Sequence, residues 1–391
     1  MAMDAERIVI IGAGPAGLAT ARSYRDHGGQ ANVTLLGEEP LLPYERPPLT
    51  KELLRGELDA EELAIEQEEW FDAHEVQLRL RANVTAIDPA RNSVTVDGKE
   101  DLQAAAIVIA TGSEPVRAQL PGIDHPQVMT MRRLSDSVRV AERADGREPM
   151  LVLGTGFIGC EIAASLAMRG AHVKLIGQEP LPQLQRLGPD AARRIAAWLG
   201  ELDIELILDA SVRAIHDGRS VELDDGSREE GSCLVLGMGA RPRSELARAA
   251  GLTISDGAVV VDARMRCACP GASVLAVGDV ACAQNLSAGR HLRVEHWGDA
   301  LEHGRIAGGV LAGDGGGWES VPGFWSTIGE HTLKYAAWGD GYEQARLRAH
   351  HGGGFSVWYS RGGVAVGVLT HGCDEDYERG RELIRKGAPA P

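Results

Sequence analysis

Two copies of the pattern G-x-G-x-x-G are the features of this sequence that most directly suggest a chemistry. One spans Gly12–Gly17 after the apolar run 8–11, and the other spans Gly154–Gly159 after the apolar run 150–153. Between a strand and a helix, the first glycine makes the tight turn, the second lets a pyrophosphate approach, and the third lets the helix pack closely. The N–H groups at the start of the helix favour phosphate there. The chain therefore predicts two dinucleotide-binding sites.

Each pattern is embedded in the same larger unit of strand, glycine turn, helix and strand. The two units are far apart in the chain, and the segments that follow their second strands, 37–40 and 177–180, also match. This wide spacing indicates two homologous domains, not a short solenoid repeat. Two dinucleotide sites in one chain suggest transfer between two cofactors. FAD in the first and NAD(P)H in the second is the expected pair, because a flavin can accept a hydride and release single electrons.

Acidic residues about 20 positions after each third glycine could accept hydrogen bonds from a ribose 2′-hydroxyl. Glu38 occupies such a position after the first pattern, and Glu179 does so after the second, beside Gln178. A 2′-phosphate would need a close arginine, and none follows until Arg186. The second site is therefore expected to prefer NADH to NADPH.

The remaining elements divide the chain into four segments. Short strands are expected at 77–80, 93–96, 106–110, 233–236 and 274–277, and a linker at 313–317. Beyond the linker the chain is rich in aromatic residues and locally neutral, which we interpret as a separate α+β domain with antiparallel strands. The expected segments are an FAD-binding domain in two parts, 1–115 and 243–320, an inserted NAD(H)-binding domain, 116–242, and the C-terminal domain, 321–391.

Composition excludes several classes of protein. The 391 residues are 44% hydrophobic and 25% charged, which is typical of a globular chain. A net charge of −16 argues against a nucleic acid partner. The six cysteines form no C-x-x-C pair and no zinc-like cluster, so no metal site is expected. Without a signal-like N-terminus or a long apolar run, we expect a cytoplasmic protein that has no membrane partner.

Several motifs together resemble the ferredoxin and rubredoxin reductase family of FAD-dependent pyridine nucleotide oxidoreductases. That family serves oxygenase systems, and it is also similar to the flavoprotein part of apoptosis-inducing factor. Besides the two glycine patterns, the motifs that carry the resemblance are Pro43–Lys51 (P-Y-E-R-P-P-L-T-K), Ala110–Gly112, Gly237–Pro242, Gly278–Asp279 and Phe324–Ser326. The resemblance implies an α/β fold like that of glutathione reductase, with the NAD domain inserted into the FAD domain and an α+β domain at the C-terminus.

The resemblance also assigns roles to individual residues. Lys51 would lie near the reactive edge of the flavin and stabilise negative charge there. Glu161 would pair with it from the start of the second helix, where the dipole also favours a carboxylate. Asp279 would bind the ribityl chain, Trp297 would flank the flavin, and Trp325 would close the nicotinamide side.

Taken with the glycine patterns, the resemblance implies two sets of binding residues. The FAD set is Gly12, Gly14, Ala16, Gly17, Glu38, Arg46, Lys51, Val84, Ala110, Thr111, Gly112, Arg132, Asp279 and Trp297. The NAD set is Gly154, Gly156, Phe157, Ile158, Gly159, Glu179, Gly239 and Trp325.

The cysteines argue against the related disulfide reductases. Those enzymes carry a redox-active cysteine pair on the helix after the first unit, and Leu41–Lys51 contains no cysteine. Cys160 at the start of the second helix is expected to serve packing. Cys267 and Cys269 are expected at the end of a strand, without a redox role.

The sequence therefore predicts a ferredoxin–NAD(P)+ reductase-type enzyme that passes electrons from NADH through FAD to a ferredoxin-type iron–sulfur protein or to rubredoxin. Two alternatives stay open at this point. One is a redox sensor that binds NADH, turns over slowly and changes its oligomeric state. The other is an NADH oxidase or diaphorase that uses oxygen or quinones. The sequence does not indicate the oligomeric state.

Overall fold

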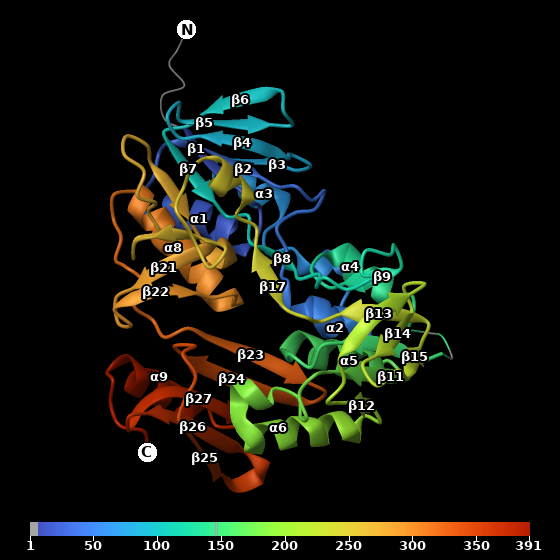
Figure 1. The fold of residues 1–391 in the computed structure, drawn as a ribbon. Coiled ribbons are helices and arrows are strands. Elements are labelled where there is room, and N and C mark those ends of the chain that lie inside the picture. Colours follow the sequence, from blue (N-terminus) through green and yellow to red (C-terminus); the bar gives the residue numbers. More distant parts are fainter. Residues whose placement is uncertain (1–6, 145, 147) are drawn as a thin grey trace. The chain divides into compact units, whose positions relative to one another are not determined.

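The computed structural model describes residues 7–144, 146 and 148–391. These residues form two compact units, each assembled from three separate stretches of the chain. Unit 1 comprises the chain up to Glu45 together with Ala64–Glu114 and Arg241–Gly323. Unit 2 comprises Arg46–Leu63, Pro115–Ala240 and Phe324–Pro391. Figure 1 shows both units as a ribbon coloured by position along the chain, from blue at the N-terminus to red at the C-terminus.

A five-stranded parallel sheet forms the centre of unit 1. Its order is β20-β7-β1-β2-β3, so the first strand of the chain lies in the middle, with all its residues but Arg7 buried. The register pairs Ile11 with Leu36 on one side and with Ile109 on the other. The strands of this sheet are β1 (Arg7–Ile11), β2 (Asn32–Leu36), β3 (Val76–Arg79), β7 (Ala106–Ile109) and β20 (Val274–Ala276).

Two helices from distant parts of the sequence pack against each other in unit 1. They are α1 (Pro15–Asp26) and α8 (Trp297–Leu311). Small residues permit the close contact, because a Cβ on Gly304 would lie 2.3 Å from the carbonyl oxygen of Ala16. The helices α3 (Glu68–Ala73) and α7 (Glu245–Ala249) complete the helices described in this unit.

Two smaller sheets belong to unit 1 as well. The first is antiparallel, and the second contains one parallel pair. Their strands are β4 (Val84–Asp88), β5 (Ser93–Val96) and β6 (Glu100–Gln103) in the first, and β18 (Ile254–Ser255), β19 (Ala258–Val261), β21 (Ala281–Asn285) and β22 (Arg290–Arg293) in the second.

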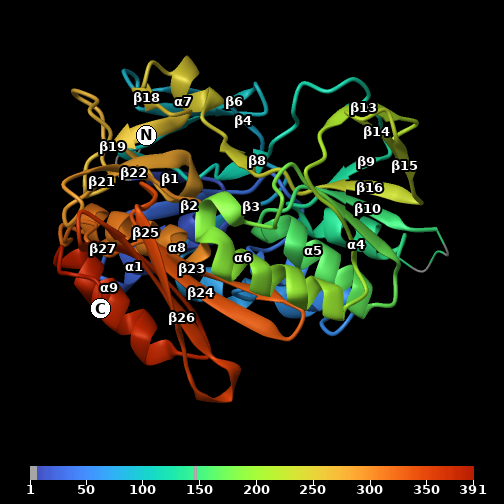
Figure 2. The same cartoon turned by 60° about the horizontal axis from the view of Figure 1, so that its bottom comes forward.

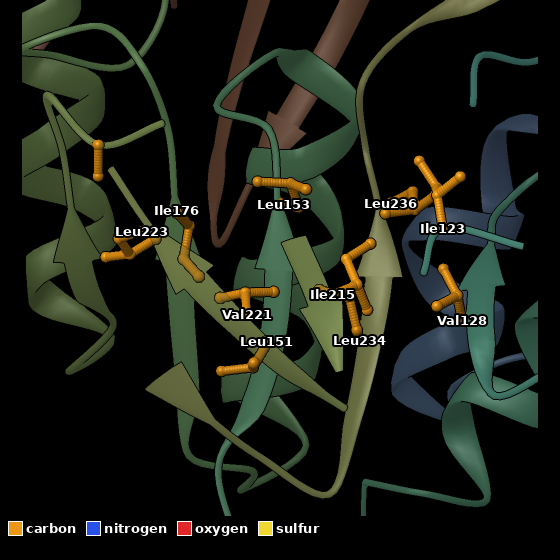
Figure 3. Close-up of a cluster of buried hydrophobic side chains, with 11 residues drawn as sticks. Ile123, Val128, Leu151, Leu153, Ile176, Ile215, Val221, Leu223, Leu234 and Leu236 are labelled. Carbon is orange, nitrogen blue, oxygen red and sulfur yellow. The ribbon is translucent and has the colours of Figure 1, made fainter. Parts of the chain in front are cut away.

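Unit 2 contains a second five-stranded parallel sheet, in the order β12-β11-β10-β16-β9, and the antiparallel sheet β13-β14-β15. Buried side chains from both sheets form one apolar cluster, in which Leu151, Leu153 and Leu234 meet Ile215 and Val221 (Figure 3). The strands are β9 (Val128–Thr130), β10 (Met150–Leu153), β11 (Val173–Ile176), β12 (Glu205–Ile207), β13 (Val212–His216), β14 (Ser220–Leu223), β15 (Arg228–Glu230) and β16 (Cys233–Leu236).

The C-terminal part of unit 2 is the antiparallel α+β arrangement that its composition predicts. Its five-stranded sheet has the order β23-β24-β27-β26-β25, and α9 (Asp374–Arg385) packs against β24, β26 and β27 (Figure 2). The strands are β23 (Gly323–Ile328), β24 (His331–Ala337), β25 (Gln344–Ala349), β26 (Phe355–Arg361) and β27 (Val364–His371). The other helices of unit 2 are α2 (Glu52–Arg55), α4 (Leu134–Ala141), α5 (Phe157–Met168) and α6 (Leu184–Glu201).

Apart from boundary shifts of one to three residues, the units divide the chain differently from the predicted segments at two places. The C-terminal segment, which we expected as a separate domain, groups with the inserted segment in unit 2. Residues 46–63, which we expected in the first FAD-binding segment, group with unit 2. The reason is that α2 and the short 3-10 helix over Pro47–Thr50 pack against α4 and α5. The strands β8 (Ser113–Pro115) and β17 (Ala240–Pro242) carry the chain out of unit 1 and back into it. The domain boundaries themselves stay a prediction.

Candidate functional site

The first glycine pattern forms an open cradle at the end of β1. Gly12 has φ +113°, and a Cβ there would lie 2.2 Å from the carbonyl oxygen of Ala110. A Cβ on Gly17 would lie 2.0 Å from the carbonyl oxygen of Gly12, so only glycine permits this close packing of α1. By contrast, a Cβ on Gly14 would meet nothing within 4 Å. The first turn of α1 contains no acidic residue, so the cradle suits a pyrophosphate.

The second glycine pattern repeats this geometry in unit 2. Gly154 has φ +115°, and a Cβ there would lie 2.5 Å from the carbonyl oxygen of Gly237. A Cβ on Gly159 would lie 1.8 Å from the carbonyl oxygen of Gly154, whereas one on Gly156 would have no neighbour closer than 3.8 Å. The first turn of α5 also lacks an acidic residue. Both cradles therefore fit the dinucleotides that the sequence predicts.

The two acids expected at ribose already have protein partners. The carboxylate of Glu38 lies 2.7 Å from the guanidinium of Arg243, and both side chains are partly exposed. The backbone of Arg243 is itself held, because its N–H donates to Gly112 and its carbonyl accepts from the Thr111 hydroxyl at 2.7 Å. Sequence reasoning missed Arg243, although it directly follows the Gly237–Pro242 motif.

Glu179 follows β11 in unit 2 and has a different partner. Its carboxylate accepts a hydrogen bond from the backbone N–H of Gln185, in the first turn of α6, at 2.8 Å. The carboxylate thus supports the start of that helix. Gln178 beside it is exposed. The ribose roles of Glu38 and Glu179 stay predictions.

Asp279 lies in unit 1 just after β20, the strand that borders β7 in the parallel sheet. Its carboxylate accepts a hydrogen bond from the Ser113 hydroxyl at 2.7 Å. The neighbouring Gly278 has φ +72°, and a Cβ there would lie 3.0 Å from the Cβ of Ala16 in α1. This close approach places the segment around Asp279 next to the first glycine helix.

Val84, another residue of the predicted FAD set, is buried in β4.

A buried ion pair joins two distant segments of unit 2. The ammonium of Lys51 lies 2.7 Å from Oε2 of Glu161, and the two residues are 5% and 2% exposed. The Thr50 hydroxyl donates to the same oxygen at 2.6 Å. The Ser326 hydroxyl and the Thr327 N–H donate to Oε1 at 2.7 and 3.3 Å. The structure thus forms the pair that the resemblance implied, although its role toward a cofactor stays a prediction.

The expected helix position of Glu161 is wrong. The helix α5 begins at Phe157, so Glu161 lies in its second turn, beyond the free N–H groups of the helix start. The glycine pattern occupies the turn and the first residues of the helix, which displaces the acid. Side-chain and backbone donors, not the helix dipole, therefore stabilise this carboxylate.

Besides the contacts with Glu161, three hydrogen bonds fasten the R-P-P-L-T-K segment to the rest of unit 2. The Ser137 hydroxyl of α4 donates to the Leu49 carbonyl, and the Ser165 hydroxyl of α5 donates to the Thr50 carbonyl, each at 2.7 Å. The Arg46 guanidinium donates to the Arg132 carbonyl, also at 2.7 Å. Sequence reasoning missed Ser137 and Ser165, because isolated serines in helices carry no motif.

The two tryptophans assigned to the cofactors lie in different units. Trp297 is the first residue of α8 in unit 1 and is partly buried. Trp325 lies on β23 in unit 2 and is 41% exposed. Its neighbour Phe324 packs edge-on against Phe157, with ring centroids 4.8 Å apart.

Two other residues of the predicted NAD set are accessible in unit 2. The side chain of Ile158 is 43% exposed, and Gly239 has φ +93° with open space at its Cβ position.

Comparison with known proteins agrees with this geometry. Residues 6–304 match the model of the pyridine nucleotide-disulphide oxidoreductase family. The chain belongs to this family. It is similar to the ferredoxin–NAD(+) reductase component of the anthranilate 1,2-dioxygenase system of Burkholderia cepacia, with 31% identity over 99% of this chain and 96% of the relative. It is also similar to rhodocoxin reductase of Rhodococcus erythropolis, with 29% identity over 98% and 90% of the two chains.

A solved structure extends the similarity to the whole fold. The reductase chain in the covalent putidaredoxin reductase–putidaredoxin complex matches 98% of this oxidoreductase and 94% of its own length, with a TM-score of 0.92 and 27% identity. The predicted fold class, two Rossmann-like domains followed by an α+β domain, is thereby confirmed. The predicted family is confirmed as well.

The cysteines of this oxidoreductase are free thiols. Burial raises the pKa of the Cys160 thiol far above its usual range and that of Cys233 to about 11. We expected Cys267 and Cys269 at the end of a strand, and this is wrong. They lie in an irregular segment after β19, where Arg266 makes only an isolated bridge to Leu275. Among the residues described, no helix has the length and apolar character needed to cross a membrane.

Proposed function

We propose that the chain is an FAD-dependent reductase that takes electrons from NADH and passes them to a ferredoxin-type iron–sulfur protein or to rubredoxin. The observation that carries this proposal is the presence of two open glycine cradles, each at the end of the middle strand of a parallel sheet, in one chain. The names of the relatives, which include reductases of ferredoxin and of rhodocoxin, support the class of electron acceptor.

The chain's residues have distinct tasks in this proposal. FAD, when bound, accepts a hydride from NADH and can release electrons one at a time. Gly12–Gly17 and Gly154–Gly159 would hold the pyrophosphates of FAD and NADH at the starts of α1 and α5. Lys51 would present a positive charge where negative charge develops during reduction. Glu161 keeps that ammonium in one place through the 2.7 Å contact.

The cysteine chemistry supports electron transfer rather than disulfide reduction. The buried Cys160 thiol has a strongly raised pKa, so it is protonated at neutral pH and is a poor nucleophile. The proposed reaction needs no protein nucleophile and no general base. We also propose a preference for NADH over NADPH, because Gln178 and Glu179 offer a 2′-phosphate no positive charge. A cytoplasmic location accords with NADH as the reductant.

The test is anaerobic stopped-flow spectroscopy of the FAD-loaded protein. We expect one equivalent of NADH to bleach the flavin absorbance on the timescale of enzymatic turnover. Two equivalents of oxidised [2Fe–2S] ferredoxin added afterwards should restore it, because each cluster accepts one electron. Pure protein that is colourless and does not take up added FAD would contradict the proposal. Slow reoxidation by ferredoxin with a change in oligomeric state would favour a redox sensor instead. Fast reoxidation by oxygen or a quinone, but not by ferredoxin, would favour an oxidase or diaphorase.

A further inference from the structure

A glutamine outside the glycine patterns lies at the second cradle. The side-chain nitrogen Nε2 of Gln183 is 4.0 Å from the position that a Cβ on Gly156 would occupy. Apart from the carbonyl oxygen of Gly237, at 3.8 Å, it is the nearest group to that open position. Gln183 immediately precedes α6, whereas Gly156 immediately precedes α5. Both belong to unit 2.

The amide nitrogen of Gln183 has no protein partner among the described residues. The residue is 5% exposed, and Nε2 makes no hydrogen bond within that part of the chain. A buried amide donor without an acceptor loses its hydrogen bonds to water and gains none in return, so native proteins rarely leave one in this state. Such a group next to an open glycine cradle indicates that a ligand supplies the acceptor.

The backbone at this position is also unusual. Gln183 has φ +62°, a left-handed conformation that glycine adopts easily and other residues rarely adopt. A long amide side chain is therefore held where the backbone favours glycine. Strained residues of this kind concentrate at binding sites, where the surrounding structure maintains them.

We propose that Gln183 is a further ligand of the dinucleotide and that its amide donates a hydrogen bond to a pyrophosphate oxygen. The inference rests on the proposed function, in which unit 2 binds NADH. The start of α5 supplies N–H groups to one side of the pyrophosphate. Gln183 approaches Gly156 from the start of α6 and adds a neutral donor. Because NADH and NADPH share the pyrophosphate, this contact raises affinity for both and leaves the preference between them unchanged.

The test compares Gln183→Met with wild type by anaerobic calorimetric titration with NADH and with ADP-ribose, which keeps the pyrophosphate but lacks nicotinamide. The FAD-loaded protein is first reduced with dithionite, so that NADH binds without transferring a hydride. Methionine preserves the length of the side chain and removes the donor. We expect both dissociation constants to rise by about tenfold or more, as for a lost hydrogen bond to a charged group. Gln183→Glu is expected to weaken binding further, because a carboxylate would face the phosphates.

The stability of the ligand-free protein supplies a second readout. Because Nε2 lacks a partner in the described structure, Gln183→Met is expected to melt at the same temperature as wild type or at a higher one. The matched control is Gln185→Met, the same change at an exposed side chain in the first turn of α6, which should alter neither binding nor melting.

Specific outcomes would overturn the inference. Unchanged affinity of Gln183→Met for both ligands would show that the amide contacts neither. Weakened NADH binding with unchanged ADP-ribose binding would place the contact on the nicotinamide half instead. A Gln183→Met protein that melts earlier or fails to fold would show that Nε2 has a structural partner. Wild-type protein that binds neither ligand would contradict the proposed function itself.

Discussion

Removing either charge from the buried Lys51–Glu161 pair should destabilise unit 2 strongly. Glu161 is only 2% exposed. In Lys51→Met its carboxylate keeps three neutral hydrogen-bond donors, from Thr50, Ser326 and Thr327, but loses its positive partner. Leaving one partner of a buried pair uncompensated typically costs ~3–5 kcal/mol. Because three neutral donors remain, we expect about 3 kcal/mol for Lys51→Met, at the low end of that range.

Glu161→Gln and the double variant Lys51→Met/Glu161→Gln test whether the two charges stabilise each other. Glu161→Gln leaves the Lys51 ammonium with the carbonyl of Pro47 at 3.1 Å and the hydroxyl of Thr50 at 3.4 Å, so its cost should be similar. The double variant Lys51→Met/Glu161→Gln buries no charge. It should therefore be more stable than the sum of the single effects predicts, by about 2 kcal/mol.

The assay is urea unfolding with saturating FAD, followed by tryptophan fluorescence, because Trp198 and Trp358 are buried in unit 2. The matched control is the exposed pair of Glu382, on α9, and Lys386, just after it. The Lys386 Nζ lies 2.6 Å from the Glu382 Oε1. Solvent screens that pair, so Lys386→Met and Glu382→Gln should have little effect and show no coupling. A Lys51–Glu161 coupling as small as that of the control would show that the buried pair contributes no more to stability than an exposed one.

The same variants test the proposed role of Lys51 in electron transfer. Loss of the ammonium should slow reduction by NADH by ~10- to 100-fold, since each ~1.4 kcal/mol in the barrier changes the rate tenfold. FAD content should change little, because the glycine cradle of unit 1 is intact. The measurement is anaerobic stopped-flow reduction at confirmed FAD occupancy. An unchanged rate and an unchanged flavin potential would show that Lys51 has only a structural role.

Three further predictions concern other sites. Glu179→Arg should shift the ratio of kcat/KM values toward NADPH by about tenfold, and an unchanged ratio would reject a role in nucleotide choice. Iodoacetamide followed by mass spectrometry should find Cys160 unlabelled in the native protein and labelled after unfolding, because its thiol is buried and its pKa is raised. Burial lowers the pKa of His303 from 6.5 to about 4. The unfolded state therefore binds a proton first as pH falls, and stability should decrease by about 3 kcal/mol between pH 6.5 and pH 4. Urea midpoints of His303→Gln should show a weaker dependence across this range, and an equal dependence would contradict the reasoning.

Local patterns in the sequence predicted most of the elements that form the cradles. The strands before Gly12 and Gly154 and the helices after them arise from short-range preferences, namely an apolar run, a residue with positive φ, and a free helix start. Such features depend on neighbours within a few positions, so they can be read before the fold is known. The family resemblance added the pairing of Lys51 with Glu161, which no local pattern could supply between two segments so distant in the chain.

Patterns along the chain were enough to predict two strand–glycine–helix units and a neutral, aromatic-rich C-terminal domain. Which polar groups meet could be seen only in the folded chain. Ser326 reaches Glu161, Arg243 reaches Glu38, and the Gln183 amide lies beside Gly156 without a partner among the described residues. These contacts depend on how helices and sheets pack across long intervals of sequence. Single serines, arginines and glutamines leave no periodic signal of such packing, because their hydrogen bonds are chosen by distance in space and not by spacing along the chain.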